Sequence, residues 1–187
     1  VKLEKVQEAL ENVNPLLILE EKLVELMLKY GDQLLNRTSP ENEPFQITVI
    51  EEIMNHLEED QCEIISPVNQ KIIEEIKLGI QQNQLRSGNF FMTFMDESIT
   101  SRTADALVNP YETSNWEKHN IYFSKEEELV EKIVSDVIIR YKREYIVKII
   151  NELKQQLSEE DNEEAYKKII SLTQLKNKID QKLYRIL

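Results

Sequence analysis

The sequence is poor in turn-forming residues and in cysteine. Its 187 residues include only three glycines and five prolines, which leaves little room for hairpins or a many-stranded barrel. The single cysteine, Cys62, excludes an internal disulfide. One cysteine and two widely separated histidines, His56 and His119, are too few for a Cys/His zinc site. No apolar run approaches the roughly 20 residues that cross a bilayer. These absences predict a helical, soluble protein in a reducing, cytoplasmic compartment.

Motifs for catalysis are missing too. The sequence has no glycine-rich phosphate loop, no Gly-x-Ser-x-Gly, no His-x-x-x-His and no Asp-x-Asp pair. The Glu-x-x-His spacing of carboxylate-bridged metal bundles is also absent. The acidic residues before Cys62 should raise the pKa of its thiol, which argues against a reactive nucleophile. We therefore predict no catalytic residue, no metal ligand and no cofactor site in this chain.

Negative charge dominates, but one segment is basic. Lysine and arginine number 23 against 35 acidic residues, a net charge of −12, which opposes strong binding to nucleic acid. Residues 165–187 reverse this balance, because Asp180 is their only acid against six bases: Lys167, Lys168, Lys176, Lys178, Lys182 and Arg185. Two interpretations remain open, a solvated helix face and a basic surface for an acidic partner.

Apolar residues recur at helical spacing along most of the chain. This pattern predicts helices over residues 3–13, 16–30, 47–57, 68–80 and 99–108. Gly31 is expected to end the second helix in a left-handed conformation. Ser66 and Pro67 form a strong start signal, an N-cap followed by proline at the first helical position. The polar stretch 36–44, with two prolines, is predicted to be a loop.

The last third of the sequence predicts a helical hairpin. A capping box at Ser124–Glu127 should start a helix that runs to about Leu157, roughly 50 Å. A polar turn over 158–164 leads to a second helix, which should fold back antiparallel. The predicted fold class is all-α, with a bundle of six to seven helices followed by the long helix and the terminal hairpin. We expect residues 1–15 to be a lead-in from a preceding domain, 16–141 the bundle and 142–187 the hairpin.

The order of these motifs resembles the C-terminal domain of bacterial DnaG-type primases. The resemblance covers roughly residues 16–187. It rests on Glu20–Gly31 (EEKLVELMLKYG), the acidic Glu58–Asp60 followed by Ser66–Ile72 (SPVNQKI), Ala104–Leu107 (ADAL) and Ser114–Glu117 (SNWE). It implies a domain that docks the primase on the N-terminal domains of the hexameric DnaB-type replicative helicase and stimulates that helicase during primer synthesis. It further implies a parent primase whose catalytic domain is absent here, acting at the bacterial replisome.

The expected contacts with this partner lie on the terminal hairpin. Four residues fall off its internal seam and are our candidates for helicase contact, with internal packing as the alternative: Tyr166, Leu175, Tyr184 and Leu187. Three other identities remain open: the similar N-terminal domain of the helicase itself, an unrelated helical adaptor or dimerisation module, and an enzyme with a site in a cleft between bundle and hairpin.

Overall fold

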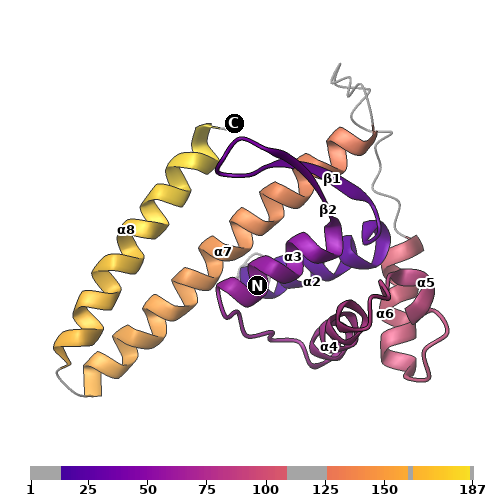
Figure 1. The fold of residues 1–187 in the computed structure, drawn as a ribbon. Coiled ribbons are helices and arrows are strands. Elements are labelled where there is room, and N and C mark those ends of the chain that lie inside the picture. The colour runs from indigo at the N-terminus through magenta and orange to yellow at the C-terminus, as the bar shows by residue number, and fades with distance from the viewer. Residues whose placement is uncertain (1–13, 109–125, 160–161, 186–187) are drawn as a thin grey trace, which may run out of the picture.

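The computed structural model describes residues 14–108, 126–159 and 162–185. Within these ranges the chain forms seven helices and one two-stranded sheet (Figure 1). Their bounds are α2 Pro15–Tyr30, β1 Leu34–Thr38, β2 Pro44–Thr48, α3 Val49–Glu59, α4 Pro67–Gln81, α5 Gly88–Phe91, α6 Glu97–Val108, α7 Glu126–Glu159 and α8 Glu163–Arg185. The prediction of a mostly helical chain is confirmed. The helix predicted over 3–13 and the capping residue Ser124 lie outside the described residues.

Helix α2 is the centre of the core. It packs against α3, α4, α5, α6 and α7, and seven of its 16 residues are buried. Leu23, Val24 and Met27 are almost completely buried, and Ile50 and Ile53 of α3 pack into the same cluster. Burying such side chains fully stabilises the fold by about 1.5–3 kcal/mol each. The bundle therefore has a core of its own, which does not depend on α8.

Side chains at the helix starts fix how the elements are joined. Ser66 caps α4 as predicted, with Pro67 at its first position. The buried carboxylate of Glu20 in α2 accepts hydrogen bonds from the backbone amides of Ile65 and Ser66, at 2.6 and 2.9 Å, and from Asn69 Nδ2 at 2.9 Å. A carboxylate near a helix N-terminus is favoured by the helix dipole. Glu20 thus ties the start of α4 to the middle of α2.

The predicted loop over 36–44 is only partly correct: residues 39–43 connect two strands, whereas 36–38 and 44 belong to the strands of a β-hairpin. Strands β1 and β2 pair antiparallel, with Leu35 opposite Ile47. Leu35 is buried in the core while its neighbours along β1 are partly or fully exposed, so the polar sequence is that of a hairpin with one solvated face. Ile47 belongs to β2, and α3 begins only after Thr48, which forms a capping box with Glu51.

The conformation predicted for Gly31 is also wrong. Its φ and ψ are −55° and −34°, in the right-handed helical region. Glycine is required here by space, since an added Cβ would collide with the carbonyl oxygen of Met27 and lie 2.5 Å from Cδ1 of Ile50. The last turn of α2 and the close approach of α3 together explain this residue.

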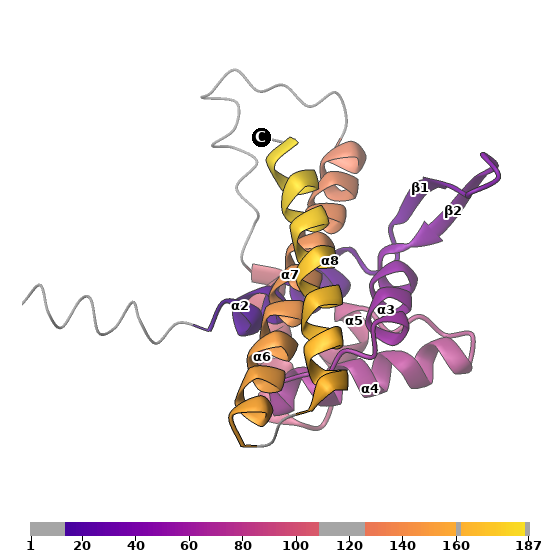
Figure 2. The same ribbon diagram turned by 90° about the vertical axis from the view of Figure 1, so that its left-hand side faces the viewer.

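Helix α7 links the bundle to the terminal hairpin. It is one continuous helix of 34 residues, and the predicted boundary between residues 141 and 142 falls inside it. Its first half packs on α2, α3 and β1, and α8 then runs back antiparallel along it (Figures 1 and 2). An ion pair between Arg143 Nε and Asp180, at 2.8 Å, joins the two helices. Figure 2 shows α8 on the outer side of α7.

Candidate partner-binding surface

Helix α8 is the most lightly packed long helix of the protein. It packs against α7 and against no other described element to a comparable extent. Among its side chains that the structure describes, Ala165 alone is fully buried. Three large apolar side chains are about half exposed: Tyr166 at 50%, Ile170 at 58% and Leu175 at 47%. Helix α8 therefore offers apolar surface that the described part of the chain does not cover.

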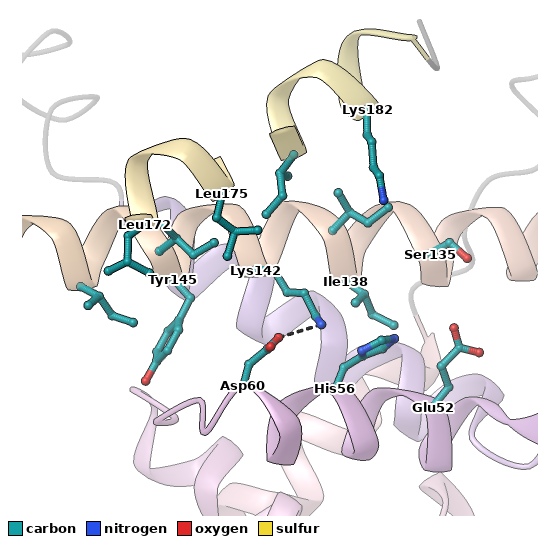
Figure 3. A pocket seen from close by; sticks show the side chains of 14 residues that line it. Glu52, His56, Asp60, Ser135, Ile138, Lys142, Tyr145, Leu172, Leu175 and Lys182 are labelled. Carbon is teal, nitrogen blue, oxygen red and sulfur yellow. Dashed lines mark ion pairs between the residues drawn. The ribbon is translucent and has the colours of Figure 1, made fainter. Parts of the chain in front are cut away.

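The predicted contact residues do not form one patch. Tyr166 and Ile170 are four positions apart and share one face of α8, whereas Leu175 is nine positions, or two and a half turns, beyond Tyr166. Leu175 instead lines a groove on the side that faces the bundle (Figure 3). Tyr184 belongs to α8, but its side chain, like the whole of Leu187, lies outside the described part.

The groove lies between α3, α7 and α8 and has a volume of about 560 Å³. Helix α7 contributes its floor, α8 one wall and α3 the other, as the side chains in Figure 3 show. Half of the 14 lining residues are aliphatic: Ile138, Ile139, Ile146 and Ile149 from α7, and Leu172, Leu175 and Ile179 from α8. The site is thus suited to receive apolar side chains.

The acidic groups of the groove are already engaged in ion pairs. Lys142 Nζ lies 2.8 Å from Asp60, at the end of α3. The Glu52 carboxylate is held by Arg37, whose Nε is 2.8 Å from Oε2 and whose Nη2 is 3.0 Å from Oε1. Burial lowers the pKa of His56, with a smaller contribution from Lys142, so its imidazole is neutral at physiological pH. Both carboxylates of the α3 wall are therefore paired, although Glu52 shares Arg37 with Glu131 of α7.

The basic excess of the hairpin is only partly neutralised. Lys167 pairs with Glu163 and Lys176 with Asp180, each at 2.8 Å. Among the lysines and arginines whose side chains the structure describes, four have no interaction partner there, and all four are on the hairpin: Lys154, Lys168, Lys178 and Lys182. Of these, Lys182 lines the groove (Figure 3). Uncompensated positive charge is therefore concentrated on the hairpin.

The comparisons with known proteins identify a family. A family model described as a domain of unknown function (DUF8430) matches residues 4–186. The chain belongs to this family. No curated protein and no solved structure matches it.

In the described part of this family member, no group of three or more His, Cys, Asp and Glu side chains is placed to hold a metal ion. Over the same residues, no helix combines the length and the apolar character that a membrane span requires.

Sequence reasoning missed the groove for an identifiable reason. The spacing of apolar residues in the last helix places Leu172 and Ile179 on one face, but it does not show that this face lines a groove. The opposite wall comes from α3, more than a hundred residues earlier, and nothing local in the sequence indicates that α3 faces α8. Ile170 was also missed, although an aliphatic residue off the apolar stripe of a polar helix is a signal that could have identified it.

Proposed function

We propose that this chain is the helicase-binding C-terminal domain of a bacterial primase. In this role it docks the primase on the N-terminal domains of a hexameric DnaB-type helicase in the cytoplasm and stimulates that helicase during primer synthesis. The bundle followed by a long helix and a terminal hairpin provides the scaffold, and the parent protein carries the polymerase chemistry in another domain. The observation that carries the proposal is that, among the described elements, α8 packs extensively only against α7 and exposes large apolar side chains.

The exposed side chains can supply useful affinity. Full burial of a large apolar side chain is worth about 1.5–3 kcal/mol, so covering the half-exposed Tyr166, Ile170 and Leu175 would contribute about half of that for each. A few such residues dominate the binding energy of most protein interfaces. The hairpin, which α7 joins rigidly to the bundle, would present them at a fixed distance from it.

Charge favours an acidic protein partner over nucleic acid. The net charge of −12 opposes association with phosphate backbones. Lys168, Lys178 and Lys182 nevertheless give α8 a locally positive surface. Complementary charges of this kind raise association rates and select among partners. The proposed helicase surface is accordingly expected to be acidic.

Titration of the chain with purified replicative helicase tests this proposal. We expect the wild-type chain to bind, and Tyr166→Ala combined with Leu175→Ala to weaken binding at least tenfold, about 1.4 kcal/mol. Leu85→Ala is the matched control, because Leu85 is 43% exposed but belongs to the bundle side of the molecule. Equal affinities of the wild-type chain and the double variant would refute α8 as the contact, and no binding by the wild-type chain would refute the function.

Sedimentation separates this function from two alternatives. A helicase-binding domain should be monomeric at low micromolar concentration without helicase. A dimerisation module would instead form a tight dimer through α8. The N-terminal domain of a helicase would bind purified primase, so binding of the chain to primase in place of helicase would identify that alternative.

A further inference from the structure

The groove is formed by three helices, α3, α7 and α8, and it is open on the side where a fourth helix could pack. Its floor on α7 extends from Ser135 to Ile149, about 21 Å at 1.5 Å per residue. Walls from α3 and α8 stand on either side of this floor (Figure 3). A partner helix of about four turns has the length of the floor, and its apolar stripe would contact all three helices at once.

The charges around the groove specify what kind of helix fits. On the α3 wall, Asp60 is paired with Lys142, and Glu52 shares the Arg37 guanidinium with Glu131 of α7. On the α8 wall, Lys182 has no partner among the described residues. Lys178, one turn before Lys182, also has none. The α8 side of the rim therefore carries uncompensated positive charge among the described residues, and an occupant with acidic residues flanking its apolar stripe complements it.

We infer that the groove between α3, α7 and α8 binds one acidic amphipathic helix of a partner protein. The inference relies on the proposed function only for the identity of that partner, the helicase. A second copy of this chain is a poorer occupant, because each copy carries a net charge of −12 and would bring the same unpaired lysines on its hairpin. The groove thus adds a helix-in-groove contact to the exposed face that carries Tyr166 and Ile170.

A synthetic peptide tests the groove without any helicase. The probe is an 18-residue amphipathic helix with leucines at three- and four-residue spacing and glutamates on both flanks. The matched control peptide keeps the leucines and replaces every glutamate by lysine. With methyl-labelled chain, we expect the glutamate peptide to shift the NMR signals of Ile138, Ile139, Leu172 and Ile179. The lysine peptide should bind at least fivefold more weakly.

Two charge reversals on the hairpin make the test specific. Lys182→Glu places negative charge at the groove and should weaken binding of the glutamate peptide at least tenfold. Lys154→Glu is the matched control, because Lys154 is also exposed and unpaired on the hairpin but does not line the groove. It should change the affinity less than twofold. Both positions are exposed on helices, so neither substitution is expected to disturb the fold.

The outcomes separate the groove from the proposed function. Absence of groove shifts with the glutamate peptide, or equal effects of the two reversals, would overturn the inference. NMR signals of the groove that shift when the chain is diluted would indicate that a second copy occupies it, and would also overturn the inference. Larger shifts with an oligonucleotide than with the glutamate peptide would do the same. Helicase binding without groove shifts would leave the adaptor function intact and overturn the groove, whereas peptide binding without helicase binding would support the groove and refute the proposed function.

Discussion

Cys62 shows how burial decides the chemistry of a single residue. It follows α3, packs against the core near Tyr141, and is only partly exposed. Burial raises the pKa of its thiol to about 12, and the neighbouring charge of Asp60 adds to this effect. The acidic sequence before Cys62 predicted the direction of this shift, but the largest cause is burial, which a sequence does not display.

We predict that Cys62 reacts slowly with iodoacetamide in the folded chain. At pH 8 the thiolate fraction should be about a thousandfold below that of a thiol with a pKa of 9, since each unit is a tenfold change. The thiol has a pKa of about 9 in the unfolded chain and about 12 in the folded chain, so the unfolded chain loses this proton at lower pH. The free energy of unfolding should therefore fall as pH rises from about 9 towards 12, and the thiol should not change it below pH 9. The rate of iodoacetamide labelling is measured by mass spectrometry between pH 7 and 10, with the urea-unfolded chain as the reference. Equal labelling rates of the folded and unfolded chains at pH 8 would contradict the slow reaction.

At the scale of elements, Arg37 joins three parts of the fold. It projects from β1, forms a bidentate ion pair with Glu52 of α3, and reaches Glu131 of α7 through Nη1. Its Nη2 also donates to Ser135 Oγ at 3.2 Å. The β-hairpin is therefore bound to the same stretch of α7 that begins the floor of the groove.

Removing the Arg37 guanidinium should lower the free energy of unfolding more than removing an exposed charge does. Arg37→Ala leaves the Glu52 carboxylate, 11% exposed, without its cation, and we expect a loss of about 2–3 kcal/mol in the free energy of unfolding. Arg140→Ala is the control, because its pair with Asp136 is exposed and should contribute less than about 0.5 kcal/mol. Urea denaturation of both variants measures the difference, and similar midpoints would argue against this role of Arg37.

At the scale of the whole molecule, stability should be uneven. The bundle surrounds α2 with five helices, whereas α8 rests on α7 and buries only Ala165 fully among its described side chains. Elements with few buried apolar contacts open locally, without unfolding of the rest. A lightly held α8 is consistent with a surface that gains its remaining contacts from a partner.

Amide hydrogen exchange should reveal this gradient. We predict that amides in the middle of α8 exchange at least tenfold faster than those of α2 and α4, because they open without breaking the core. The second half of α7, which α8 covers, should exchange at intermediate rates. The exchange is followed residue by residue by NMR at neutral pH, and α8 amides that exchange together with those of α2 would show a single cooperative unit.

The sequence by itself determined the helices whose signals are local. The cap at Ser66 and Pro67 and the turn before α8 depend on neighbouring residues, and the apolar stripe of α7 repeats over 34 residues, so each could be read without knowledge of the fold. Only the tertiary structure decided that residues 34–48 form a β-hairpin, that Gly31 is a close contact with Ile50, and that α3 faces α8 across a groove. These features depend on contacts between residues distant along the chain. Such contacts come from packing around α2, and local sequence patterns do not predict them.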